Sequence, residues 1–264
     1  MDLRRPLSPE TVAAIDSGMD EYAVLVFRGQ DISDEEQLAF SRALGPIESS
    51  IGGNITRLDQ RRLGTDIADV SNLDQNQNIY ARDDRRRLFN LGNRLWHSDS
   101  SFRAIPAKYS LLSARSIPAD GPNTEYADMR AAYDALDDKI KAEVEGLICE
   151  HSLMYSRGQL GFTDFTEEEQ QTFAPVRQVL VRTHPVTMRR SLFLASHAGN
   201  ENIATALGGT YTVLSWLTMN KLNNIQKIVP GVHEVVIENS KEEVDILLNK
   251  IQTLQRPFDM SILR

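Results

Sequence analysis

Cysteine is almost absent from the 264-residue sequence: Cys149 is the only one, so no intrachain disulfide can form. Small secreted domains that depend on disulfides need several paired cysteines, and nothing here indicates an oxidising compartment. Residues 1–10 contain no apolar core of signal-peptide length, and no run approaches the roughly eighteen consecutive apolar residues of a membrane span. We therefore predict a cytoplasmic protein without a membrane partner.

The chain also lacks a surplus of positive charge. It has 29 Lys and Arg against 37 Asp and Glu, for a formal net charge of −8 at pH 7. A nucleic-acid partner requires basic side chains that neutralise phosphates, and this balance argues against one. The one conspicuous basic run, "RDDRRR" at residues 82–87, is interrupted by Asp83 and Asp84. A solvated loop is the simpler interpretation of that run.

The composition is that of a globular protein, with 41% hydrophobic and 25% charged residues. The apolar spacing and the capping residues predict helices over 8–22, 33–44 and 129–147. Compact apolar runs or alternating patterns predict strands at 23–29, 95–102, 107–117, 123–129, 176–185 and 189–197. Residues 48–87 are polar and weakly patterned, which is typical of a long functional loop. Runs of strands with helices set apart predict an α+β fold with a mainly antiparallel sheet or barrel.

The stretch "NRLWHSDSSFR", residues 93–103, places an imidazole and a carboxylate two positions apart. On an extended strand, residues i and i+2 project to the same face, so His97 and Asp99 would converge on one point. With a second imidazole from elsewhere, they would form the facial triad that holds non-haem Fe(II) and leaves coordination positions open. A surface histidine beside a solvated aspartate is the alternative for this short pattern.

The surrounding sequence resembles a known family. "NRLWHSDSSF", followed by "AKYSLLSARSIPADGPNTEYADMRAAYDAL", is similar to the TauD/TfdA family of Fe(II)- and 2-oxoglutarate-dependent dioxygenases, and most to its 2,4-dichlorophenoxyacetate dioxygenase-like branch. The resemblance continues upstream through "YAVLVFRGQDISDEEQLAFSRALGPIE" and "DVSNLD", and downstream through "VRTHPVTMRRSLFLASHAG". It covers about residues 1–200. It implies a double-stranded β-helix (jelly roll) with flanking helices.

The resemblance also implies roles for individual residues. His97 and Asp99 match the first two iron ligands, Thr124 matches a residue that holds the 2-oxoglutarate carboxylate, and Asn93 matches a position near the substrate. The implied reaction uses O2 to oxidise a small, carboxylate-bearing organic substrate, with release of succinate and CO2. Family members are often dimers or tetramers, so a homo-oligomer is expected. Outside the family, Thr124 would be interpreted as a β-branched strand residue chosen for packing.

Residues 201–264 depart from the family pattern. Family members end with W-D-N-R, a distal histidine that completes the triad and an arginine that pairs with 2-oxoglutarate, and W-D-N-R is missing here. His233 is a candidate third ligand, with a simple strand histidine as the alternative. If "QRPFDMSILR" is aligned with the family's last segment, Arg264 falls on the 2-oxoglutarate arginine. Residues 239–254 read as a capped amphipathic helix and not as a barrel strand, which would make that match accidental. The resemblance further implies an earlier strand, usually carried by the family, that has no counterpart before residue 1.

We therefore expect a TauD/TfdA-like dioxygenase domain at 1–200 and a divergent C-terminal segment at 201–264. The jelly roll is incomplete at the C-terminus unless that segment supplies its last strands. Three hypotheses follow: a working dioxygenase whose C-terminal segment supplies ligands in an unfamiliar way, a non-catalytic scaffold derived from the family, and a metal-binding jelly roll with other chemistry. The third iron ligand decides between them.

Overall fold

The structure, a computed structural model, describes residues 1–50, 53–116, 124–199, 203–205 and 210–211. Residue contacts divide the chain into two compact units. The first comprises Met1–Asn90 and Ala107–Pro122, and the second comprises Leu91–Pro106 and Asn123–Arg264. No helix in the described part of the chain is long and apolar enough to cross a membrane.

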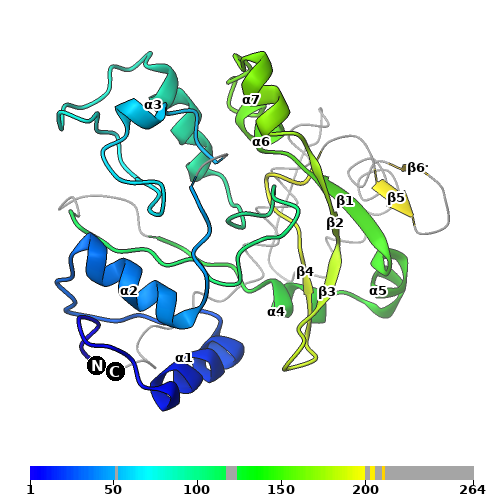
Figure 1. Ribbon diagram of the computed structural model, residues 1–264. Helices are drawn as coiled ribbons and strands as arrows, with labels where there is room; N and C mark the ends of the chain where they lie inside the picture. Colours follow the sequence, from blue (N-terminus) through cyan, green and yellow to red (C-terminus); the bar gives the residue numbers. More distant parts are fainter. Residues whose placement is uncertain (51–52, 117–123, 200–202, 206–209, 212–264) are drawn as a thin grey trace, which may run out of the picture. The chain divides into compact units, whose positions relative to one another are not determined.

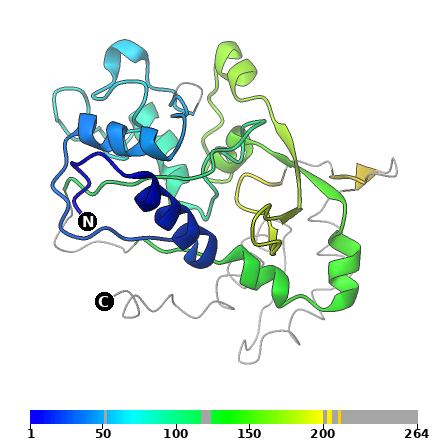
Figure 2. The same cartoon turned by 60° about the horizontal axis from the view of Figure 1, so that its bottom comes forward.

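Two helices organise the first unit, and both begin where the sequence predicts. α1 (Pro9–Tyr22) follows the N-cap residue Ser8, and α2 (Asp34–Leu44) follows Ser33 (Figures 1 and 2). Each serine hydroxyl accepts a hydrogen bond from a first-turn backbone amide, and Ser33 takes part in a complete capping box. The buried side chains between the helices are Leu3, Ile15, Ile32 and Phe40.

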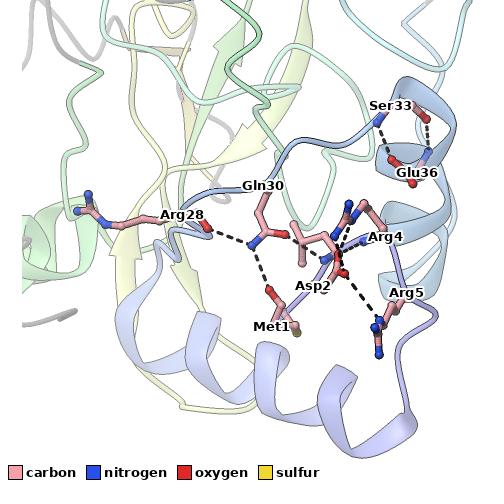
Figure 3. Close-up of polar contacts among 9 residues, drawn as sticks. Met1, Asp2, Arg4, Arg5, Arg28, Gln30, Ser33 and Glu36 are labelled. Atoms are coloured by element: carbon pink, nitrogen blue, oxygen red, sulfur yellow. Dashed lines mark hydrogen bonds and ion pairs between the residues drawn. The ribbon is translucent and has the colours of Figure 1, made fainter.

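A single glutamine ties the start of the chain to the segment between these helices. Gln30 Nε2 donates to the carbonyl oxygens of Met1 and Arg28, both at 3.0 Å, while its Oε1 accepts from the Leu3 amide at 3.1 Å (Figure 3). One side chain thus satisfies three backbone groups, which holds Leu3 in the small core.

The long polar segment of this unit is mostly irregular, as its composition predicts. It contains the single 3-10 turn η1 (Leu58–Gln60) and ends at the short helix α3 (Arg85–Asn90). Arg62 and Asp69 form a two-point ion pair across it, at 2.7 and 3.0 Å. Such local contacts order a loop whose side chains bury little apolar area.

The second unit contains several short helices. They are η2 (Leu91–Arg94), α4 (Met129–Asp134), α5 (Asp138–Val144), α6 (Leu153–Gly158) and α7 (Glu167–Thr172). The predicted single helix over 129–147 is wrong, because the chain breaks between α4 and α5. The Asp137 carboxylate accepts a hydrogen bond from the Ile140 amide at 2.8 Å and so begins a new helix at that point.

Two antiparallel sheets complete the second unit (Figure 1). The first has the order β2-β1-β5-β6, and the second pairs β3 with β4. The strands are β1 (Leu147–His151), β2 (Val176–Val179), β3 (Val181–Thr183), β4 (Arg190–Leu192), β5 (Ile203–Thr205) and β6 (Thr210–Tyr211). Cys149 lies opposite Gln178 in the β1–β2 register. The predicted strand at 176–185 is present as two strands, β2 and β3, and the predicted strand at 189–197 is confirmed only in its first part, β4.

The core of the second unit joins residues of α4 and α5 to residues of the strands, and α4 packs against β4. Its buried members are Ala132, Tyr133, Ile140, Val144, Cys149, Leu180, Leu192 and Ala198. Burial of this set is the main favourable contribution that fixes the strands beneath the candidate site.

The other predicted strands are wrong within the described residues. Segments 23–29, 95–102, 107–116 and 124–128 form no strand. In the first of these, Leu25 and Phe27 pack against the α1–α2 cluster, so the apolar run meets helices and not a neighbouring strand. The helices and antiparallel sheets together confirm the α+β class.

Candidate metal centre

The side chains of His97 and Asp99 converge. His97 Nε2 lies 3.1 Å from Asp99 Oδ1, and His97 Nδ1 lies 2.7 Å from the carbonyl oxygen of Leu95. The predicted convergence is confirmed, but its expected cause is not, because the pair lies on an extended segment that enters a turn. Ser100, directly after Asp99, has the left-handed φ of 58°, which non-glycine residues rarely adopt. The turn, and not strand alternation, aims the carboxylate at the imidazole.

The electrostatics of the pair follow from this geometry. The hydrogen bond to Asp99 raises the pKa of His97, and burial opposes it, while the Leu95 carbonyl adds to the rise. The Asp99 side chain is 58% exposed, against 26% for His97. The pair therefore joins a partly shielded nitrogen to an accessible carboxylate.

Residues 195–198 hold the stretch that carries His97 against the sheet. The Ser196 amide donates to the Trp96 carbonyl at 2.9 Å, and the Ser152 amide donates to the His197 carbonyl at 2.8 Å. Residues 195–198 thus lie between the histidine-bearing stretch and the end of β1, where Ala198 bridges to His151.

His197 lies beside the pair. Its ring centroid is 5.9 Å from that of His97 and 5.2 Å from that of Phe102, and its Nδ1 is 2.9 Å from the Ser156 hydroxyl. Burial, the positive charge of Arg157 and then His97 lower the pKa of His197 to about 3. It is therefore a neutral, buried imidazole at ordinary pH, consistent with a core or supporting role.

Arg157, on α6, is a buried cation at this site that the sequence did not single out. It is 5% exposed, and burial lowers its pKa to about 10. Its Nη2 donates to Asn93 Oδ1 at 2.9 Å, and its Nη1 donates to the Ser156 hydroxyl at 3.3 Å. The guanidinium lies directly against the backbone of Gly92, where a Cβ would come within 2.2 Å of Nη1. Asn93 and His197 are thus joined through α6. In the sequence "LMYSRG" Arg157 is an ordinary helix residue. Only its tertiary contact with Gly92 indicates that it contributes to the site.

The remaining predicted residues are more scattered. Thr124 is exposed on an irregular segment that precedes α4, not on the predicted strand. His151 is fully buried, and His184 accepts the Val186 and Thr187 amides in the β3–β4 turn. His233 and Arg264 lie outside the described residues. Within the part that the structure describes, no group of three His, Cys, Asp or Glu residues is placed to hold a metal ion.

Comparison with known proteins adds a family relationship. The family model "Taurine catabolism dioxygenase TauD, TfdA family" matches residues 1–209. The chain is 43% identical over 212 residues to the alpha-ketoglutarate-dependent 2,4-dichlorophenoxyacetate dioxygenase of Cupriavidus pinatubonensis, covering 79% of this chain and 72% of that protein. It is 37% identical over 187 residues to an (S)-phenoxypropionate/alpha-ketoglutarate-dioxygenase of Sphingobium herbicidovorans, covering 67% of this chain and only 59% of that protein.

A solved structure is also similar over most of the chain. It is the crystal structure of AAD-2 in complex with Mn(II) and N-oxalylglycine, with a TM-score of 0.78 and 49% sequence identity. The match covers 98% of this chain and 78% of that one.

Proposed function

Because this chain belongs to the TauD/TfdA family of alpha-ketoglutarate-dependent dioxygenases, we propose that it is an Fe(II)- and 2-oxoglutarate-dependent dioxygenase in which His97 and Asp99 are two of the iron ligands. The single observation that carries the assignment of ligands is the 3.1 Å approach of His97 Nε2 to Asp99 Oδ1. Family membership alone would not place these two atoms together.

The two side chains fit a divalent metal ion. Two ligand atoms each about 2.1 Å from one ion, and at right angles to each other, lie about 3.0 Å apart. The observed separation of 3.1 Å matches that requirement. The Leu95 carbonyl can accept only from a protonated Nδ1, so release of the proton that Nε2 shares with Asp99 would leave the lone pair on Nε2, where it could bind a metal ion.

When bound, iron and 2-oxoglutarate would supply the oxidation of a substrate C–H bond by O2, with release of succinate and CO2. The chain's own residues would bind and orient the reactants. Thr124 is proposed to hold a 2-oxoglutarate carboxylate, with Arg264 as the candidate partner of the far carboxylate. His233 remains the candidate third ligand, and the coordination positions that these three residues leave open would be available to 2-oxoglutarate and O2.

The proposed architecture is the jelly roll of the family, with a dioxygenase domain at 1–200 and residues 201–264 as a divergent C-terminal segment. It is supported by the similarity to AAD-2 and by the antiparallel β2-β1-β5-β6 sheet. The sheet presents β1 next to the segment that carries His197. That arrangement gives the His97 stretch a rigid base.

The proposed substrate is a small organic acid. Arg157 donates to Asn93 Oδ1, and a guanidinium has no acceptor, so the amide nitrogen is the end of Asn93 that can face a ligand. Such a donor suits a carboxylate or ether oxygen. The relatives act, by their names, on 2,4-dichlorophenoxyacetate and (S)-phenoxypropionate, both of which carry these groups.

Anaerobic titration with Fe(II) and 2-oxoglutarate tests the proposal. We expect a visible charge-transfer absorption band that is lost in His97→Ala and Asp99→Ala but retained in Asp83→Ala, a variant of an exposed aspartate in the first unit. No band from the unaltered chain at saturating 2-oxoglutarate would refute the proposal and favour the non-catalytic scaffold. A band lost in His233→Ala and kept in His151→Ala would identify the third ligand.

A further inference from the structure

Gln178, on β2, joins the sheet to the turn that carries Asp99. Its Nε2 donates to the carbonyl oxygens of Arg103 and Ser101, at 2.6 and 3.3 Å. Gln178 is 6% exposed. In the β1–β2 register it lies opposite Cys149, which belongs to the core of the second unit. The contact therefore connects the turn to the hydrophobic core of that unit.

Arg182 determines which end of the Gln178 amide faces the turn. Arg182 Nη2 donates to Gln178 Oε1 at 2.6 Å, and since a guanidinium can only donate, the amide nitrogen must point toward the two carbonyls. Arg182 is itself fixed, because its guanidinium lies 3.4 Å from the ring centroid of Phe193. The ring of Phe193 stacks on buried His151 at 5.1 Å. The amide is thus oriented by a set of packed neighbours.

The turn needs such support. Ser100 occupies the left-handed region, and the turn closes through a hydrogen bond from the Arg103 amide to the Ser100 carbonyl at 2.9 Å. A non-glycine residue in that conformation costs free energy, which surrounding contacts must offset. On the N-terminal side, the Trp96 carbonyl is held by the Ser196 amide. On the C-terminal side, Gln178 binds the Ser101 and Arg103 carbonyls. Asp99 therefore lies between two backbone segments that are each held by hydrogen bonds.

We propose that Gln178 is a positioning residue for Asp99, and that Arg182 holds Gln178 in the working orientation. The inference rests on the proposed metal site, because it concerns how Asp99 is aimed at His97. In this role Gln178 binds neither substrate nor metal itself. It acts through the backbone of residues 101–103, which determines the direction of the carboxylate two positions earlier.

Two substitutions remove hydrogen bonds of Gln178 while nearly preserving the volume of its side chain. Gln178→Met keeps a side chain of similar length without donors. Gln178→Glu keeps the acceptor for Arg182 but presents a carboxylate oxygen to two carbonyl oxygens, which is repulsive. Arg177→Gln is the matched control, since Arg177 is an exposed neighbour on the same strand. Val144→Ala controls for a general loss of stability, because Val144 is 3% exposed in the same core.

The first measurement uses the full chain and Mn(II) alone, with free Mn(II) followed by its electron paramagnetic resonance signal. We expect the Kd for Mn(II) to rise about tenfold in both Gln178 variants and to change less than twofold in Arg177→Gln and Val144→Ala. Unchanged affinity in the Gln178 variants would overturn the inference. An equal loss of affinity in Val144→Ala would do so too, because the effect would then reflect stability.

The second measurement needs no metal and separates this inference from the proposed function. Hydrogen exchange of the peptide spanning residues 98–105 should be faster in Gln178→Met and Gln178→Glu, and unchanged in Arg177→Gln. If the unaltered chain binds no Mn(II), the proposed function fails on that result alone. If exchange in 98–105 does not respond to Gln178, the positioning role fails whether or not the metal binds.

Discussion

Gly92 lies directly against the guanidinium of Arg157. A Cβ at Gly92 would come within 2.2 Å of Nη1 and 2.4 Å of the central guanidinium carbon. Because Gly92 has no side chain, the buried guanidinium of Arg157 on α6 can reach Asn93. This close approach connects two short helices, η2 and α6, that are far apart in the sequence.

Gly92→Ala should consequently destabilise the protein. The added methyl group cannot be accommodated without displacing Arg157, and overpacking of this kind costs about 1–3 kcal/mol of unfolding free energy. Urea denaturation followed by circular dichroism measures it. Gly158→Ala is the matched control, since Gly158 is the residue after Arg157 and a Cβ there meets nothing within 4 Å. Equal stability of the two variants would contradict the close approach.

Asn93→Asp tests the orientation of the Asn93 amide. A carboxylate keeps the contact with Arg157 and strengthens it by charge, but it removes the amide donor. We expect unchanged or higher thermal stability, unchanged affinity for Mn(II), and a KM for a phenoxy-acid substrate raised at least tenfold, since the new charge repels a carboxylate. Asn93→Ser, which retains a donor, should have the smaller effect on KM. A KM unaffected by Asn93→Asp would show that this residue does not face the substrate.

The sequence predicted the starts of α1 and α2 and two of the six expected strand segments, but not the other four strand segments or the break between α4 and α5. The caps at Ser8 and Ser33 and the strands of 176–185 depend on neighbouring residues, so the pattern of a short window determines them. The prediction of a strand at 23–29 is wrong, because Leu25 and Phe27 pack against helices and not against a neighbouring strand. A buried apolar run has the same appearance in both environments, and only the tertiary partner distinguishes them.

In the candidate site too, the sequence predicted some features and missed those that depend on tertiary contacts. The side chains of His97 and Asp99 converge as predicted, but the predicted cause, alternation along a strand, is wrong, because a turn at Ser100 brings them together. Arg157 and Gln178 were not predictable, because their partners lie 64 and at least 75 positions away in the sequence. Neither residue has a local pattern that distinguishes it from an ordinary helix or strand residue.

The C-terminal end of α1 offers a stabilising substitution. Ala23 has the left-handed φ of 62°, and its amide donates to the Met19 carbonyl at 2.8 Å. Glycine adopts this conformation without the steric cost of a Cβ, so Ala23→Gly should raise the unfolding free energy by about 0.5–1 kcal/mol. Ala14→Gly, at an exposed position within the same helix, should lower it by about 1 kcal/mol. Thermal and urea unfolding of both variants compare the two effects, and a destabilised Ala23→Gly would contradict this conformation.

His151 should make the protein sensitive to acid. Burial, aided by the positive charge of Arg182, lowers the pKa of His151 from 6.5 to about 4. Between these pH values the unfolded chain binds more protons than the folded one, so the unfolding free energy falls as the pH falls from 6.5 toward 4. The full loss from this group, reached below pH 4, is about 3 kcal/mol.

His151→Leu should therefore flatten the dependence of stability on pH between 6.5 and 4, as measured by urea denaturation at several pH values. Leucine fills a comparable volume against Phe193 and does not titrate. Cys149→Ala is the control on the same strand: burial raises the pKa of this thiol to about 12, so it carries no charge change in the acid range. The control should lose stability by a similar amount at every pH and keep the slope of the unaltered protein. A His151→Leu variant with that same slope would show that the pKa of His151 is not lowered in the folded state, and that His151 is more accessible to water than its burial indicates.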